Sequence, residues 1–387
     1  MPRTALIVGA GVGGLAAGIA LRKAGWRVRV FERAAQAREL GFALNLAPNA
    51  MAALRELGVA EPLLAEGARP GPIAEMRSAG GSLLRRVKMP AALERVPSVV
   101  ALRPVLHGAL MNALGPEALE LSREAAGFDV QHAVPSLRFA DGSTAAGDVI
   151  IGADGVASVL RRQLHPGEGP PRDSGYIAIR GVAYDAEHLL GDLGAVAYFA
   201  PGIESAVVRA GRHAIYWYMS LLADDLPRPI PAVGTVVEHV GASFDDQYRR
   251  IIQATRREDM RLEPLFDRDP IDNWASGPVT LLGDAAHPML PHAGQGAAQA
   301  LEDAVALGLV LAEDGDITAA LRRYERVRAA RTRRIVAQAR RIASVTTTRN
   351  RVLGWMRNAG VRLVPASAMM SAFYLSDTRD PHHELRS

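Results

Sequence analysis

Apolar runs and amphipathic segments alternate along the first part of the chain, in the pattern that is typical of an α/β domain. Residues 5–8 form a short apolar run that predicts a buried parallel strand, and residues 28–31 predict a second strand. A helix is expected between them. Further on, Pro48 and Gly58 stand where a short helix begins and ends, and residues 103–114 have apolar positions at helical spacing.

The hydrophobic period changes in the middle of the chain. Four segments with strand-like character are separated by glycine, proline and charged turns, at residues 176–181, 196–199, 205–208 and 214–220. They predict a mostly antiparallel sheet that is distinct from the first one. A buried strand returns at residues 280–284, and long helical segments follow. The first domain is therefore expected to be discontinuous, with the second sheet inserted into it.

A glycine-rich turn lies between the first strand and the helix after it. Gly9 suits the tight turn, Gly11 lets a pyrophosphate approach the backbone, and Gly14 lets the helix pack on the strand. The helix N-terminus then faces the phosphates with its positive partial charge. Glu32 ends the second strand, where a carboxylate accepts hydrogen bonds from a ribose diol and repels a 2′-phosphate. The pattern predicts a site for FAD or NAD, formed by Gly9, Gly11, Val12, Gly13, Gly14, Glu32 and Arg33.

Two further segments follow predicted strands. Asp154 and Ser158 come after a buried strand and are placed to cap a short helix. Asp284 stands at the carboxyl end of another strand, which is the edge where open α/β sheets bind ligands. Gly294 and Gly296 then open a helix whose free N–H groups suit an anion or a carbonyl.

The composition of the 387-residue chain excludes several classes of function. The chain is 49% hydrophobic and 22% charged, with a net charge of +4 and no cysteine. Disulfides and thiolate chemistry are thereby excluded. We expect no metal, no stable membrane insertion and a cytoplasmic protein. Residues 321–342 hold nine arginines against one acid, Glu325. The favoured interpretation is a solvated helical face with no specific nucleic-acid partner, and the alternative is a patch for nucleic acid or anionic lipid.

In their order, the motifs at Gly9, Asp154 and Gly283 resemble those of the single-component FAD-dependent aromatic hydroxylases, the para-hydroxybenzoate hydroxylase type of flavoprotein monooxygenase. The resemblance implies an α/β fold: a Rossmann-type FAD-binding domain, an inserted, mostly antiparallel β-sheet substrate domain, and C-terminal helices. The expected domains are residues 1–72, 98–172 and 262–345 for FAD, residues 73–97 and 173–261 for substrate, and residues 346–387 for a C-terminal helical segment.

The resemblance also implies which residues hold the cofactor. Glu32 and the glycine turn would bind the ADP part of non-covalent FAD, Arg103 its phosphate or ribityl side, and Asp284 its ribityl chain. The Asp154–Gly155 segment would serve both FAD and the reduced nicotinamide, and the loop of residues 41–48 would pass near the flavin. The segment against the flavin ring would contain Pro291, Gly294, Gln295, Gly296 and Ala297.

The chemistry implied by the resemblance is hydroxylation of an aromatic or polycyclic small molecule. NADPH or NADH would reduce FAD, O2 would add to give a flavin hydroperoxide, and one oxygen would pass to the ring. Tyr216, His292 and Arg180 are the candidate catalytic residues, and Tyr198 and Tyr218 are further candidates for lining the substrate.

Two other classes of function stay open at this point. One is a FAD-dependent dehydrogenase or reductase that inserts no oxygen, and the other is a nucleotide-binding regulatory protein that uses its arginine-rich helix for a partner. The substrate, the choice between NADH and NADPH, the catalytic base and the oligomeric state also stay open.

Overall fold

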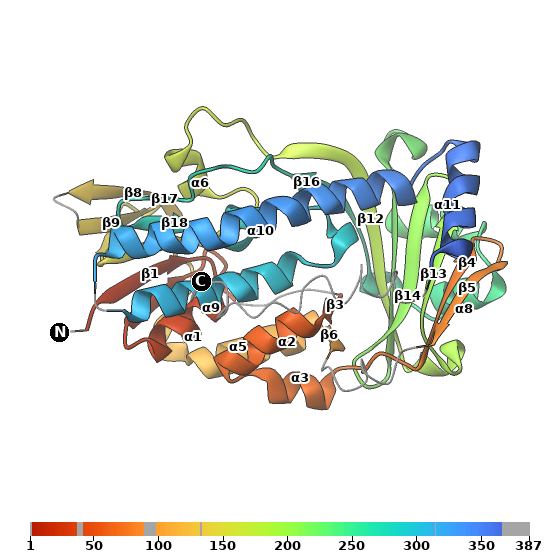
Figure 1. Ribbon diagram of the computed structural model, residues 1–387, viewed down its shortest axis with the longest axis horizontal. Helices are drawn as coiled ribbons and strands as arrows, with labels where there is room; N and C mark the ends of the chain where they lie inside the picture. Colours follow the sequence, from red (N-terminus) through yellow and green to blue (C-terminus); the bar gives the residue numbers. More distant parts are fainter. Residues whose placement is uncertain (1, 37–41, 89–97, 132–133, 314, 366–387) are drawn as a thin grey trace.

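In the described part of the chain, six strands form the first sheet. The computed structural model (Figure 1) describes residues 2–36, 42–88, 98–131, 134–313 and 315–365. The sheet has the order β17-β18-β11-β1-β2-β7, and its strands are parallel except for β17 at one edge. The strands are β1 (Thr4–Val8), β2 (Arg27–Phe31), β7 (Leu119–Glu120), β11 (Val149–Gly152), β17 (Ala275–Ser276) and β18 (Val279–Leu281). The strands expected at residues 5–8 and 28–31 are confirmed.

Helices pack against this sheet and share one hydrophobic core with it. α1 (Val12–Lys23) connects β1 to β2, and α9 (Gly296–Ala312) crosses α1 so closely that a Cβ on Gly308 would lie 2.8 Å from the Cβ of Ala20. The expected helices are confirmed as α2 (Pro48–Leu57) and α5 (Arg103–Leu114). The remaining elements of this part are α3 (Ala60–Glu66), α6 (Val159–Leu164), the ribbon of β3 (Ala43–Leu46) and β6 (Val99–Leu102), and the antiparallel strands β8 (Ala125–Gln131), β9 (Val134–Phe139) and β10 (Thr144–Ala146).

The second sheet has seven strands among the described residues, in the order β16-β12-β15-β14-β13-β4-β5. Its neighbours are antiparallel except for β13 and β4. The strands are β4 (Ile73–Ser78), β5 (Leu83–Lys88), β12 (Arg172–Tyr184), β13 (Leu193–Ala200), β14 (Ile203–Ala210), β15 (Ala214–Leu222) and β16 (Met260–Asp267). The four expected strands between residues 176 and 220 are confirmed, and β16 continues to Asp267, past the expected boundary at residue 261.

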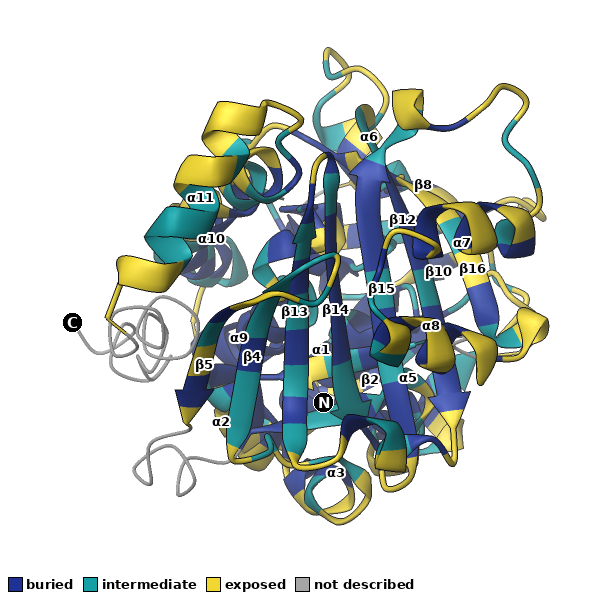
Figure 2. Ribbon diagram, turned by 90° about the vertical axis from the view of Figure 1, so that its right-hand side faces the viewer, coloured by how far each residue is buried: buried dark blue, intermediate teal, exposed yellow. Residues whose placement is uncertain are grey.

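The register of the second sheet decides which side chains share a face. Tyr198, Ser205 and Met219 are paired directly across β13, β14 and β15, so they point to one side. On this side lie α7 (Val233–Gly241) and α8 (Asp246–Gln253), as Figure 2 shows. Arg180 is paired with Tyr218, and both point to the opposite side. Tyr198 was expected beside them, and that expectation is wrong, because strand side chains alternate between the two faces.

Two C-terminal helices complete the described chain. α10 (Ile317–Thr346) is long enough to run beside both sheets, and α11 (Arg351–Leu363) packs near β5 at the far end (Figure 1). Residues 366–387, which belong to the expected C-terminal helical segment, lie outside the described residues. Among the described helices, none combines the length and apolar character needed to cross a bilayer. The same residues contain no cluster of three or more metal-ligating side chains.

Candidate functional site

Four loops follow the carboxyl ends of neighbouring parallel strands. In the sheet order β18-β11-β1-β2, these loops begin with Asp284, Asp154, the glycine turn and Glu32. Parallel strands end at the same edge of a sheet, so motifs that are far apart in the sequence lie side by side there. The structure thus brings together the residues that were expected to bind a dinucleotide.

The glycine turn is packed too closely for larger residues. Gly9 has a φ of 100°, and a Cβ at this position would lie 2.4 Å from the carbonyl oxygen of Ala153. A Cβ on Gly14 would lie 1.9 Å from the carbonyl oxygen of Gly9, which shows how closely α1 approaches the end of β1. Gly11 caps α1 with a φ of −73°, so this position needs no left-handed backbone.

Glu32 joins the end of β2 to the glycine turn. Its Oε2 accepts the N–H of Ala10 at 2.9 Å, and its Oε1 accepts the N–H of Ala34 at 3.0 Å. A carboxylate has about four acceptor positions, so lone pairs are left for the hydroxyl groups of a ribose. Arg33, the neighbouring candidate, is exposed.

Asp154 and Ser158 cap α6, as expected. Their side chains accept N–H groups of the first turn at 2.8 and 2.9 Å, respectively. Asp154 Oδ1 is buried without a hydrogen-bond partner among the described residues, and burial raises the pKa of this carboxyl group. Arg161, which is fully buried, donates to the carbonyl oxygens of Ala285 and Ala286 at 3.1 and 2.8 Å. It therefore ties the Asp154 loop to the Asp284 loop.

Asp284 lies exposed at the carboxyl edge of the first sheet, just after β18. Its side chain is accessible, yet burial by the surrounding protein raises its pKa, against the opposing charges of His287 and Arg103. A Cβ built on Gly155, Gly294 or Gly296 would meet no atom within 4 Å. Three of the expected cofactor loops therefore border open space.

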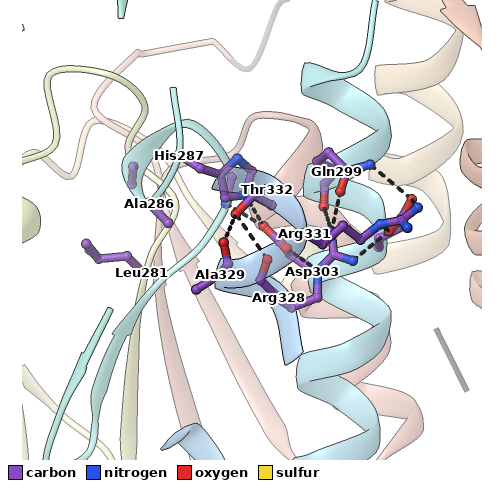
Figure 3. A network of polar contacts seen from close by, with 12 residues as sticks. Leu281, Ala286, His287, Gln299, Asp303, Arg328, Ala329, Arg331 and Thr332 are labelled. Atoms are coloured by element: carbon purple, nitrogen blue, oxygen red, sulfur yellow. Dashed lines mark hydrogen bonds and ion pairs between the residues drawn. The ribbon is translucent and has the colours of Figure 1, made fainter. Parts of the chain in front are cut away.

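A buried network of charged side chains holds the Asp284 loop (Figure 3). Asp303 accepts the N–H of Gly283 at 3.0 Å, and His287 Nε2 lies 2.5 Å from the same carboxylate. Arg328 donates to Asp303 at 2.7 Å and to Glu302 at 2.6 Å. Burial alone would raise the pKa of Asp303, but His287 and Arg328 hold it at about 2. Asp303 is therefore a carboxylate that fixes the backbone of the loop.

The same network reaches the start of α9. Asn49 Nδ2 donates to Gln295 Oε1 at 2.9 Å and to Glu302 Oε1 at 2.6 Å. Gln295 is the N-cap residue of α9, and Gly296 and Ala297 begin the helix. The N-terminal turn of α9 is thus tied to the same network as the Asp284 loop.

Tertiary contacts also neutralise much of the arginine-rich segment, which forms most of α10. Arg328 is 1% exposed and lies between Glu302 and Asp303. Arg340 pairs with Asp267 at 2.7 Å and with Asp269 at 2.8 Å. The expectation of a solvated face is therefore wrong for Arg328, because acidic residues from other elements meet it in the core. The absence of a specific nucleic-acid partner stays a prediction.

The three candidate catalytic residues lie together beside the 3-10 turn η6 (Pro291–Ala293). Arg180 lies 6.0 Å from the centre of the Phe42 ring, and the ring of Tyr216 is 6.2 Å from the same ring. His292 Nε2 lies 2.9 Å from Ser220 Oγ on the same face of the second sheet. Phe42 directly precedes β3, and residue 41, the first of the expected flavin loop, lies outside the described residues.

Burial keeps His292 and Tyr216 neutral near pH 7, whereas Arg180 forms an ion pair with Glu263 at 3.0 Å. It lowers the pKa of His292 to about 4, and the positive charge of Arg180 acts in the same direction. Burial raises the pKa of Tyr216 to about 12, which Arg180 opposes only in part. Tyr216 therefore carries a hydroxyl that donates hydrogen bonds, and His292 is a neutral imidazole whose buried Nδ1 has no partner among the described residues.

Sequence reasoning missed a buried acid on this face. Glu204 accepts hydrogen bonds from the hydroxyls of Tyr218, at 2.9 Å, and of Thr346 at the end of α10. Burial raises its pKa, and His292 Nε2 lies 3.9 Å away. The available signal was a single acidic residue in a strand that is mostly apolar. Asp303 and Arg328 were missed as well, although an acidic pair inside the apolar helix α9 marks a buried ion pair.

Comparisons with known proteins place the chain in a family. The model of the FAD binding domain family matches residues 3–339. Aurachin C monooxygenase/isomerase of Stigmatella aurantiaca is 34% identical over 362 residues, which cover 93% of this chain and 94% of the relative. The 3-amino-4-hydroxybenzoate 2-monooxygenase of Streptomyces cremeus is 35% identical over 348 residues, 87% of this chain and 86% of the relative.

A solved structure of an FAD-binding protein has the same fold as this chain. Klebsiella pneumoniae HpxO, complexed with FAD and uric acid, matches with a TM-score of 0.87 and 25% identity, over 96% of this chain and 95% of that protein. The chain therefore belongs to the FAD-dependent aromatic hydroxylases of the flavoprotein monooxygenase class.

Proposed function

We propose that this protein is a monooxygenase that uses FAD, NADH or NADPH, and O2 to hydroxylate an aromatic or polycyclic small molecule. The observation that carries the proposal is a shared location: the Asp284 loop at the edge of the first sheet and the face of the second sheet with Tyr216 both contact the η6 and α9 region. In this reading, residues 1–72, 98–172 and 262–345 form a Rossmann-type FAD-binding domain. Residues 73–97 and 173–261 form the substrate domain.

The residues at the sheet edge fit a flavin nucleotide. Gly9 and Gly14 leave no room for side chains at the turn, Asp154 has a carboxylate oxygen without a partner among the described residues, and Glu32 has free acceptor positions. Glu32 and the glycine turn would hold the ADP part, and Arg103 and Asp284 the phosphate and ribityl region. Non-covalent binding is supported by the lack of cysteine, which removes a thioether link.

Bound FAD supplies electron transfer from a reduced nicotinamide and activation of O2. Around it, this chain binds, orients and excludes water. The N–H groups at the start of α9 would supply positive partial charge beside the bound cofactor. Tyr216 donates a hydrogen bond to an oxygen or nitrogen on the substrate ring, and Phe42 packs beside it. Arg180 forms an ion pair with Glu263 at 3.0 Å, and the part of its positive charge that this pair leaves would favour a phenolate over a phenol.

The nicotinamide has no second glycine-rich fingerprint in the sequence, so we infer that it binds transiently near the FAD site. The resemblance to aromatic hydroxylases suggests that substrate controls reduction by this nicotinamide. An aromatic substrate is favoured over a sugar because the neighbouring walls are aromatic rings with few polar tips.

The test is a screen of aromatic compounds for stimulated NADH and NADPH oxidation by the FAD-loaded protein, with the product mass as readout. We expect a gain of one oxygen atom in the product of at least one stimulating compound. Tyr216→Phe should lower the stimulation, whereas Tyr184→Phe, which changes an exposed tyrosine at the end of β12, should not. Dehydrogenated products without added oxygen, or no NAD(P)H oxidation at all, would refute the proposal.

A further inference from the structure

The last described helix carries an apolar face that no other described part of the chain covers. None of the residues of α11 is buried. Five of its apolar side chains are strongly exposed: Val352 at 65%, Leu353 at 52%, Trp355 at 69%, Met356 at 55% and Leu363 at 81%. Figure 2 shows α11 at the edge of the molecule, with much of its outward surface coloured as exposed.

The exposed apolar residues form one stripe along the helix. Trp355 and Met356 follow Val352 by three and four residues, and Leu363 continues the stripe two turns later. Arg357 lies on the inner side, where its guanidinium stands 4.9 Å from the ring of Phe199 and donates to a backbone carbonyl of α10 at 2.6 Å. A polar contact therefore fixes the helix to the protein while its apolar stripe faces solvent. This is the reverse of an ordinary surface helix.

The charge around the stripe has one sign. α11 contains Arg351, Arg357 and Arg362 and no acidic residue, and the sequence between Glu325 and Asp377 contains no aspartate or glutamate. Arg351 and Arg362 are exposed beside the stripe. Apolar side chains with a tryptophan, flanked by arginines, have the composition of a helix that lies in the headgroup region of a membrane.

We infer that α11 binds the surface of an anionic lipid bilayer, with Trp355 and its apolar neighbours in the headgroup–acyl boundary and Arg351 and Arg362 on lipid phosphates. This is adsorption on one leaflet and not a membrane span. A second copy of the chain is a poorer occupant, because a two-fold contact through α11 would bring the arginines of both copies together without an acid from either helix.

The test uses the FAD-loaded, full-length protein and vesicles of phosphatidylcholine with or without phosphatidylglycerol. We expect sedimentation with the anionic vesicles and little with phosphatidylcholine alone. Trp355→Ser should lower the vesicle partition coefficient by about tenfold, and Arg351→Gln with Arg362→Gln should weaken binding most at low salt. Val134→Ser is the control, because it also replaces an exposed apolar side chain by serine. Val134 is 55% exposed but lies on β9, away from α11.

Tryptophan fluorescence gives a second readout. The other three tryptophans, Trp26, Trp217 and Trp274, are at most 6% exposed, so quenching by brominated anionic lipid reports on Trp355. The inference is overturned if the wild type stays in the supernatant, or if Trp355→Ser binds vesicles as well as Val134→Ser. It is also overturned if Trp355 instead mediates self-association, or capture of an acidic protein, without lipid affinity. Each of these results leaves the proposed hydroxylation unaffected.

Discussion

Arg328→Met probes the buried network that holds the Asp284 loop. Arg328 is 1% exposed and donates to Asp303, Glu302 and Gln299. Methionine retains much of the apolar volume of the arginine stem but leaves Glu302 and Asp303 buried without this cation. Arg331 still pairs with Glu302 at 2.9 Å, so the carboxylate of Asp303 loses more of its compensating positive charge than that of Glu302 does.

Removal of one partner from a buried ion pair costs about 3–5 kcal/mol of unfolding free energy, because the remaining charge is desolvated without compensation. This is a large part of the about 5–15 kcal/mol that holds a typical domain folded. The variant should also bind FAD less tightly, since Asp303 orients the N–H of Gly283 next to Asp284. A loss of about 1–2 kcal/mol there corresponds to roughly a tenfold higher Kd for FAD.

The pH dependence has a definite sign. Asp303 has a pKa of about 2 in the folded protein against 3.8 for the free group. Its stabilising contribution to the free energy of unfolding is therefore present above pH 4 and is lost as the pH falls towards 2. In Arg328→Met the pKa of Asp303 rises, and acid unfolding should begin at a higher pH.

Urea unfolding followed by circular dichroism, at pH 7 and in steps down to pH 3, measures these effects, and titration of the apoprotein with FAD measures the Kd. Arg333→Met is the matched control, because Arg333 is half exposed and pairs with the exposed Asp272. That pair should contribute only about 0–1 kcal/mol. If Arg328→Met and Arg333→Met unfold at the same urea concentration, the assignment of Arg328 as the compensating charge is refuted.

Three further outcomes are expected. Gly11→Val should abolish or strongly weaken FAD binding by filling the space in front of α1, without backbone strain because φ is −73°; an unchanged Kd would refute the placement of the glycine turn. Asp284→Ala should weaken FAD binding less, by about 1–3 kcal/mol, as measured by the same titration, and a loss as severe as that of Gly11→Val would contradict a role in one hydrogen-bonded contact. The wild-type unfolding free energy should fall by about 3 kcal/mol between pH 6.5 and pH 4. The reason is that His292 has a pKa of about 4 in the folded protein against 6.5 for the free group, so in this range the unfolded chain binds a proton that the folded protein does not. His292→Gln should remove this slope in urea titrations, and a slope that persists would mean that other groups cause it.

The local elements followed from the sequence by itself. The strand at residues 5–8, the tight turn at Gly9 and the helix after it depend on neighbouring residues and on backbone sterics, so a short window of sequence is sufficient to predict them. The caps of α6 by Asp154 and Ser158 are local for the same reason. The resemblance to the hydroxylase family rested on these windows and was confirmed by the comparisons.

Only the tertiary structure decided which distant groups meet. Arg328 in α10 meets Asp303 in α9, Arg161 in α6 meets the carbonyls of the Asp284 loop, and Glu204 meets the end of α10. The sequence around Arg328 looked like a basic surface because its neutralising acids lie on other elements. Likewise, the side of the second sheet to which Tyr198 points was set by the strand register. Such contacts depend on how whole helices and sheets pack, and that packing is a sum over many residues that no single segment of the chain contains.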